Sequence, residues 1–125
     1  MKKANEPGTG FQFGLAAEEI AAGLYERQSG RVLGRRVRNG GGEIDLIVEC
    51  GGQTIFIEVK ARSTLDRAAA ALSRRQIERI GNAAEVWLSE NGRAMQPMRF
   101  DVVLVDGSGG AEILENVLSF DDVSY

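Results

Sequence analysis

Two stretches of alternating sequence around a Gly-Gly pair constrain the fold of this chain more than any other feature. Over residues 43–50 and 53–61, apolar side chains occupy every second position, which is the period of a β-strand with one buried face. Gly51-Gly52, between them, is a pair that two-residue hairpin turns favour. The sequence therefore predicts an antiparallel hairpin, and the turn fixes its register.

This register gives the hairpin a polar face, on which Asp45 lies opposite Glu58 and Glu43 lies opposite Lys60. The apolar face carries Ile44, Leu46, Val48, Ile55, Ile57 and Val59. Two acids opposed on neighbouring strands, with Cβ atoms ~5 Å apart, repel each other, and a divalent cation would reverse that effect. Mg²⁺ takes one or two carboxylates and fills its other positions with water and phosphate oxygens. Asp45 and Glu58 are therefore predicted to hold Mg²⁺ or Mn²⁺.

Lys60 lies two residues after Glu58 and on the same face of the predicted hairpin. From there its ammonium group could orient or deprotonate an attacking water, or balance the charge that develops on a scissile phosphate. The alternative is a face of structural ion pairs, Glu43–Lys60 and Asp45–Arg62, that has no catalytic role.

The remainder of the sequence predicts further helices and strands around this hairpin. Helical spacing of apolar residues predicts helices over about 11–28 and about 65–90, and strands are expected over 31–38, 98–106 and 111–118. The stripe that predicts the second helix is Ala69, Ile77, Ile80, Ala84, Trp87 and Leu88, with Arg75 and Arg79 on the outer face. Glu18 lies at the edge of the buried face of the first helix, and Glu19 points away from it. This order predicts an α/β fold with a mixed sheet, in one domain over residues 1–125.

The net charge of −3 conceals an uneven distribution of charge along the chain. Five arginines and no acid lie between positions 27 and 38, whereas six acids and no Lys or Arg follow from position 101 onward. Arginine has a planar fork of donors that suits phosphate. The residues expected to contact a nucleic-acid backbone are Arg31, Arg35, Arg36, Arg38, Arg62, Arg74 and Arg75. For any one of them, the alternative is a solvated surface charge.

The absence of histidine and the single Cys50 exclude several classes of active site. Ser-His-Asp hydrolases, Cys-His proteases and histidine-ligated zinc sites all need residues that this chain lacks. Carboxylates, Lys and Arg remain as tools, together with an oxygen-ligated metal. No apolar run approaches the ~20 residues of a membrane span, so a soluble, cytoplasmic protein is expected.

Three residues outside the hairpin are predicted to have structural roles. Asp101 faces the same way as Arg99 on the predicted strand 98–106, which favours a structural or dimer-interface ion pair. Trp87 and Tyr25 are interpreted as core and rim residues rather than as platforms for base stacking.

An acid on one strand followed by Glu58-Val59-Lys60 on the next resembles the PD-(D/E)xK nuclease superfamily, with Asp45 as the first acid and Ile44 in the place of proline. The wider pattern resembles the YraN-like family of small bacterial proteins, which is related in fold to archaeal Holliday-junction resolvases. The features that carry this resemblance, over about residues 11–105, are GEIDLI, FIEVKAR, Gly14 with Glu18-x-x-Ala21, the arginine-rich second helix and Arg99-Phe100-Asp101-Val102-Val103.

The resemblance implies a restriction-endonuclease-like αβββαβ core with Asp45, Glu58 and Lys60 as the catalytic triad. It implies Glu18 as a metal ligand beside Asp45 and Glu58, and Glu43 as a further ligand or a partner for Lys60. Arg62, on the Lys60 face, is expected either to contact phosphate or to form a structural ion pair.

The expected function is a Mg²⁺- or Mn²⁺-dependent endonuclease that hydrolyses DNA phosphodiester bonds, with branched DNA among its candidate substrates. No base-reading element is visible, so the shape of the substrate should decide recognition. Resolvase activity would require a homodimer. Two alternatives stay open: a non-catalytic nucleic-acid-binding module of the same fold, and a protein-interaction domain that uses the acidic C-terminal segment, residues 106–125.

Overall fold

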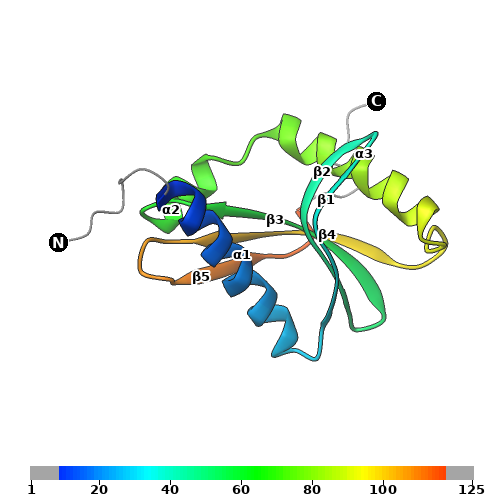
Figure 1. The fold of residues 1–125 in the computed structure, drawn as a ribbon, viewed down its shortest axis with the longest axis horizontal. Helices are drawn as coiled ribbons and strands as arrows, with labels where there is room; N and C mark the ends of the chain where they lie inside the picture. Colours follow the sequence, from blue (N-terminus) through cyan, green and yellow to red (C-terminus); the bar gives the residue numbers. More distant parts are fainter. Residues whose placement is uncertain (1–8, 118–125) are drawn as a thin grey trace.

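A computed structural model describes residues 9–117 of the chain, and it contains three helices and one five-stranded sheet within that range (Figure 1). The elements are α1 (Thr9–Glu26), β1 (Arg31–Asn39), β2 (Gly42–Cys50), β3 (Gln53–Ala61), α2 (Leu65–Ala70), α3 (Arg74–Glu90), β4 (Met98–Val105) and β5 (Ala111–Leu114). The strands are ordered β1-β2-β3-β4-β5; β3 and β4 pair in parallel, and the other neighbours are antiparallel. The predicted α/β class, with a mixed sheet flanked by helices, is confirmed.

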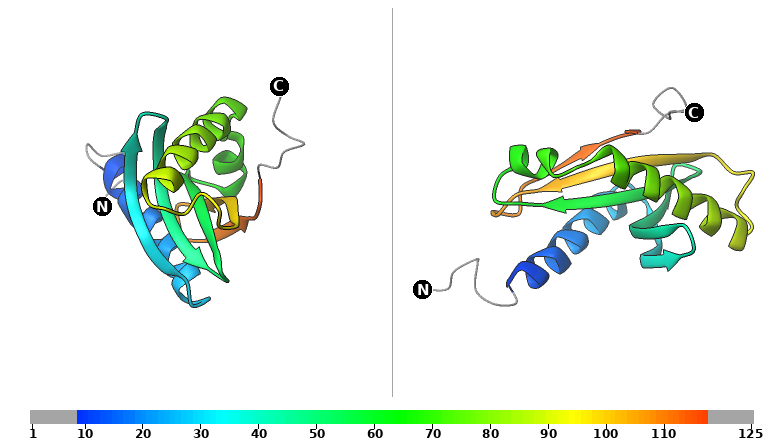
Figure 2. Two further views of the ribbon diagram at one scale, coloured as in Figure 1. Left: turned by 90° about the vertical axis from the view of Figure 1, so that its right-hand side faces the viewer. Right: turned by 90° about the horizontal axis from the view of Figure 1, so that it is seen from above.

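Helices cover both faces of the sheet, with α1 on one side and α2 and α3 on the other (Figure 2). Small residues of α1 let the helix lie close to the strands, and its buried residues are Ala17, Ala21, Ala22 and Tyr25. They pack on Leu46, Val48, Ile55, Ile57, Val103 and Val105. On the opposite face, α3 packs on Ile44, Ile47 and Phe56. Because both faces are buried, β3 and β4 carry nearly continuous apolar runs rather than a strict alternation.

The predicted hairpin register is confirmed over the half of the hairpin nearest the turn. Pairing runs from Cys50↔Gln53 to Leu46↔Ile57, and both turn glycines have positive φ (62° and 81°). Beyond Leu46↔Ile57 the two strands no longer pair, although β3 continues beside β4 as far as Ala61↔Val105. The predicted facing positions of Asp45 with Glu58, and of Glu43 with Lys60, therefore lie outside the ladder, where the sheet splits.

The apolar face of the hairpin was predicted with one error, Ile44. Alternation predicted Ile44 beside Leu46, but Leu46 packs against α1 and Ile44 packs against α3, as does its β1 neighbour Val37. The change of face falls at Asp45 and at Arg36, which has a positive φ of 49°. Because residues two apart on β2 point to opposite faces here, the period of two is broken at Asp45.

The predicted helix over 65–90 is also wrong in one respect, because it is interrupted at residues 71–73. Ser73 starts α3 with a capping box: its hydroxyl accepts from the backbone N–H of Gln76 at 3.1 Å, and the Gln76 side chain accepts from the Ser73 N–H at 3.3 Å. The break resets the helical phase, so Ala69 of the predicted apolar stripe is exposed and Ala68 is buried instead.

The C-terminal part of the described chain ends its regular structure earlier than predicted. β5 stops at Leu114, so residues 115–117 of the predicted strand 111–118 are not in a strand, and residue 118 lies outside the described residues. Of the acidic segment, 118–125 also lies outside them. Within the described chain, none of the helices is both long and apolar enough to span a membrane.

The predicted ion pair between Arg99 and Asp101 is present, and it forms part of a larger buried network. The guanidinium of Arg99 donates two hydrogen bonds to Asp101, both 2.8 Å long. The Tyr25 hydroxyl donates to Asp101 at 2.7 Å and the backbone N–H of Asn116 donates at 2.9 Å. This network ties α1 and the segment after β5 to β4, and Tyr25 is buried in the core rather than at its rim.

Candidate functional site

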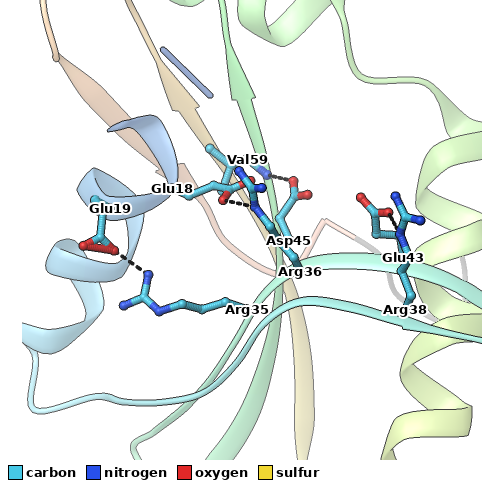
Figure 3. Close-up of polar contacts among 8 residues, drawn as sticks. All are labelled: Glu18, Glu19, Arg35, Arg36, Arg38, Glu43, Asp45 and Val59. Atoms are coloured by element: carbon cyan, nitrogen blue, oxygen red, sulfur yellow. Dashed lines mark hydrogen bonds and ion pairs between the residues drawn. The ribbon is translucent and has the colours of Figure 1, made fainter. Parts of the chain in front are cut away.

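Asp45 lies at the split between β2 and β3, where its carboxylate accepts a hydrogen bond from β3 in place of a backbone carbonyl of β2. Its Oδ2 accepts a hydrogen bond of 2.8 Å from the backbone N–H of Val59 (Figure 3). That N–H belongs to the part of β3 that no longer pairs with β2, and an unpaired backbone donor would be costly here. The split therefore turns the side chain of Asp45 towards β3 rather than towards either face of the sheet.

Glu58 and Lys60 stand on β3 beside this carboxylate. Lys60 Nζ lies 3.2 Å from Glu58 Oε2, and these side chains are only 10% and 13% exposed. Asp45, Glu58 and Lys60 all line one cleft. The structure thus brings together the three residues that the sequence predicted as a catalytic triad.

The half-buried carboxyl group of Asp45 does not behave as an ordinary aspartate. Burial raises its pKa to about 7, and the negative charge of Glu58 and a hydrogen bond with it act in the same direction. The Val59 N–H and the charge of Lys60 lower the pKa, but they do not offset these effects. The site therefore contains two carboxyl groups that cannot both be charged without a cost, which a cation would remove.

Two clefts open on this carboxylate pair, and Asp45 and Glu58 line both. The first, about 280 Å³ and here called the α1 cleft, is also lined by Phe13, Gly14, Ala17, Glu18, Val59, Lys60, Ala61 and Arg62. The second, about 230 Å³ and here called the α3 cleft, is also lined by Glu43, Gln76, Arg79 and Ile80. The pair is therefore bordered by residues of α1 on one side and of α3 on the other.

Glu18, the predicted third metal ligand, lies in the α1 cleft at the rim of the helix, with 19% of its side chain exposed. Its Oε1 accepts a hydrogen bond of 3.0 Å from Nε of Arg36 (Figure 3). Over residues 9–117, no three acidic or cysteine side chains are grouped so that they could hold a metal ion. In this arrangement, the side chains that could serve as protein ligands for a metal are Asp45 and Glu58, and Glu18 would have to leave Arg36 to join them.

Glu43 and Arg62 lie at opposite ends of the site. Glu43 lines the α3 cleft and pairs with Arg38 at 2.6 Å, whereas Lys60 pairs with Glu58, so the predicted Glu43–Lys60 contact is replaced. Arg62 lines the α1 cleft and donates to the carbonyl oxygen of Ala61 at 2.7 Å. The face of structural ion pairs that was the alternative for this hairpin is therefore not the observed arrangement.

The arginines predicted to bind nucleic acid have glutamate partners along β1, which the sequence analysis missed. The ion pairs are Arg31–Glu49 at 2.6 Å, Arg35–Glu19, Arg36–Glu18 at 3.0 Å and Arg38–Glu43 at 2.6 Å. On α3, Arg74 pairs with Glu78 at 3.7 Å, and Arg75 is exposed. Exposed ion pairs contribute little to the free energy of folding, so a phosphate group could compete with the glutamates for these arginines. The role of the arginines in binding nucleic acid stays a prediction.

Two residues of the α3 cleft, Gln76 and Arg79, were not among the predicted site residues. Arg79 was predicted on the outer face of its helix, and it is exposed, but it also lines the cleft beside Asp45. The local sequence gives no signal for this position. The position of Arg79 at the α3 cleft depends on how the turn between β1 and β2 packs against α3.

Comparison with known proteins identifies similar chains in several bacteria. The model of a family described as "Uncharacterised protein family UPF0102" matches residues 17–105, which include Glu18, Asp45, Glu58 and Lys60. A UPF0102 protein of Cereibacter sphaeroides (strain ATCC 17025) is 50% identical over 107 residues, 85% of this chain and 92% of that protein. One from Azorhizobium caulinodans is 44% identical over 109 residues (86% and 83%), and one from Granulibacter bethesdensis is 38% identical over 125 residues (99% and 79%).

Proposed function

The chain belongs to the uncharacterised protein family UPF0102, as its resemblance to YraN-like proteins predicted, and we propose that it is a Mg²⁺- or Mn²⁺-dependent endonuclease that hydrolyses DNA. One observation carries the proposal: Asp45 and Glu58 meet at a split in the sheet, and Lys60 lies 3.2 Å from Glu58. A site with clustered acids and a strongly shifted pKa, in a cleft, is a candidate for catalysis.

The two carboxylates fit a hard divalent cation. Both offer oxygen donors, and the pKa of Asp45 is raised by burial and by the negative charge of Glu58, both of which a bound cation would offset. The Val59 N–H donates to Oδ2 of Asp45. A metal would take the place of the hydrogen bond that Asp45 shares with Glu58. When bound, Mg²⁺ or Mn²⁺ would supply the charge that activates water and stabilises an attacked phosphate.

The remaining chemistry falls to residues around the pair. Lys60 is held by Glu58 and shielded from solvent, and in this proposal it orients the attacking water or balances charge on the phosphate. Arg62 lines the same cleft and can contact a neighbouring phosphate. Contacts of this kind recognise the backbone and carry no sequence information, so the proposed selectivity is for the shape of the DNA. Branched DNA as a substrate rests on the resemblance alone.

The proposal is tested by incubating purified protein with labelled branched, flapped and linear DNA in Mg²⁺, Mn²⁺ or EDTA. We expect metal-dependent cleavage that Asp45→Asn lowers by ~10³-fold or more, because Asn cannot supply the charge that holds the metal. Asp66→Asn, which makes the same substitution at an exposed position of α2, is the matched control and should cut normally. Full activity of Asp45→Asn would contradict the assignment of the site.

The outcome of the same experiment separates the other two functions that the sequence left open. Salt-sensitive DNA binding without cleavage, equal in the wild type and in Asp45→Asn, would indicate a non-catalytic binding module. Absence of both binding and cleavage would direct attention to the protein-interaction alternative.

A further inference from the structure

The α3 cleft gives the carboxylate pair a second approach, on the side of the site opposite to α1. Three acids line this cleft, and Arg79 is the one basic residue among the described residues that do so. We propose that Arg79 binds a phosphate of the nucleic-acid strand next to the scissile one, and so positions the strand across the carboxylate pair. This inference rests on the proposed nuclease function and adds a substrate-binding residue to it.

Among the described residues, Arg79 differs from the arginines of β1 in having no acidic partner. The four predicted β1 arginines each pair with a glutamate. Over residues 9–117, no hydrogen bond or ion pair engages the Arg79 guanidinium, although it shares a cleft with Glu43, Asp45 and Glu58. Glu43 is instead held by Arg38 at 2.6 Å. Within the described part of the chain, the donors of the Arg79 guanidinium are therefore available to an anionic ligand.

The turn between β1 and β2 fixes the backbone of α3 beside the site. Gly41 packs so closely that an added Cβ would lie 2.5 Å from the carbonyl carbon and oxygen of Asn82. A Cβ on Gly42, whose φ is +147°, would lie 3.2 Å from the carbonyl oxygen of Arg79. Glycines are thus required where the turn contacts the helix, because any side chain there would clash with the backbone of α3.

Asn39 completes this contact between the turn and the helix. Its Nδ2 donates to the carbonyl oxygen of Ala83 at 2.9 Å, and its Oδ1 accepts from the Gly41 N–H at 2.8 Å. Because β2 leads directly from this turn to Asp45, the same contact sets the position of Arg79 relative to the carboxylate pair. The backbone of Arg79 is therefore fixed beside the carboxylate pair before any ligand binds.

The acidic lining of the α3 cleft explains why a DNA strand would need a positively charged contact there. A DNA strand that places one phosphate at Asp45 and Glu58 must bring its neighbouring phosphates towards acidic walls. In the α1 cleft, Lys60 and Arg62 offset that charge, and in the α3 cleft Arg79 is available to do so. The planar fork of its guanidinium can form two parallel hydrogen bonds to one phosphate.

The test compares Arg79→Gln with Arg67→Gln, which removes the same charge from an exposed position of α2 that lines neither cleft. DNA affinity is measured by fluorescence anisotropy over a range of salt, with both changes made in the Asp45→Asn protein so that the DNA stays intact. We expect Arg79→Gln to weaken binding about 10-fold and to reduce the salt slope by about one. Arg67→Gln should change the affinity less than about 2-fold.

A cleavage arm separates a substrate contact from a structural role. With the native site, Arg79→Gln should raise KM or lower kcat/KM by about 10-fold, with an unchanged unfolding midpoint, and Arg79→Lys should recover part of the loss. Equal binding, salt slope and cleavage in Arg79→Gln and the wild type would overturn the inference. A fall in the unfolding midpoint without a change in the salt slope would also overturn it, because it would indicate a structural role.

The two arms distinguish failure of this inference from failure of the proposed nuclease. A wild type that binds DNA but never cuts it contradicts the nuclease alone, and the binding arm still decides the role of Arg79. A wild type that cuts, with an equally active Arg79→Gln variant, contradicts only the inference. A wild type that neither binds nor cuts DNA contradicts both.

Discussion

Two aspartates stand on inner strands of the same sheet, and their surroundings are opposite in kind. Asp101 on β4 is 1% exposed and lies in a complete set of donors. Arg99 donates twice to it, and the Tyr25 hydroxyl and the Asn116 N–H each donate once. Its charge is thus matched by a guanidinium and by hydrogen bonds, as a buried charge requires.

Asp45 on β2 has much less compensation. A single backbone N–H, that of Val59, donates to it, and its other neighbour is a second carboxyl group, Glu58. Lys60 pairs with Glu58 rather than with Asp45. Burial alone therefore does not identify a carboxylate that has a functional role. A carboxylate whose partners are complete stabilises the fold, whereas one that lacks them is suited to bind a cation.

Removing the charge of Asp101 should have the largest effect on stability and so separate the two sites most clearly. We expect Asp101→Asn to lower the free energy of unfolding by about 3 kcal/mol, because it leaves Arg99 without its main partner. Urea denaturation at neutral pH measures this effect. A loss below about 0.5 kcal/mol would mean that the network contributes little to stability.

The same substitution at the other aspartate should act in the opposite direction. Asp45→Asn, measured in EDTA at pH 8, should raise the free energy of unfolding by ~2 kcal/mol, because it removes the repulsion from Glu58 and keeps an acceptor for Val59. A destabilisation as large as that of Asp101→Asn would contradict the contrast between the two sites.

The pH dependence of this gain follows from the pKa of Asp45, which is raised from 3.8 to about 7 on folding. The folded protein binds the proton of the Asp45 carboxyl group more tightly than the unfolded chain does. The stabilisation that this protonation contributes is therefore fully present below pH 3.8 and is lost as the pH rises through 7. The advantage of Asp45→Asn over the wild type should therefore shrink as the pH falls from 8 to 4. Denaturation of both proteins at several pH values provides the measurement.

Tyr25→Phe tests the smallest element of the contrast, one hydrogen bond of the Asp101 network. Because Asp101 keeps its contacts with Arg99 and Asn116, we expect a loss of only about 1 kcal/mol in the free energy of unfolding. DNA cleavage should be unaffected, since Tyr25 lines neither cleft. A cleavage defect without a stability change would show that this network and the candidate site are coupled.

The parts of this molecule that the sequence predicted are those governed by local rules. Alternation and the Gly51-Gly52 turn were sufficient to establish the hairpin, its register near the turn and the group formed by Asp45, Glu58 and Lys60. The break before α3 also had a local signal, the capping box that begins at Ser73, but the apolar stripe nearly continues across it and concealed it.

The features that escaped prediction depend on contacts between elements distant in sequence. The face on which Ile44 packs is set by the distortion shared by β1 and β2 at Arg36 and Asp45. The ion pairs of the β1 arginines join residues 16 to 18 positions apart on α1 or β2, except for Arg38–Glu43. Arg79 reaches the site only because the glycine turn packs on its helix.

The central claim, that Asp45 and Glu58 form a divalent-cation site, is tested most directly by measuring cation binding without any substrate. Thermal unfolding of the wild type, Asp45→Asn and Asp66→Asn is followed as Mn²⁺ or Mg²⁺ is added. We expect the cation to stabilise the wild type and Asp66→Asn, by about 2.7 kcal/mol at a concentration 100 times Kd, and to leave Asp45→Asn unchanged. Equal stabilisation of all three proteins, or none in the wild type, would contradict the claim.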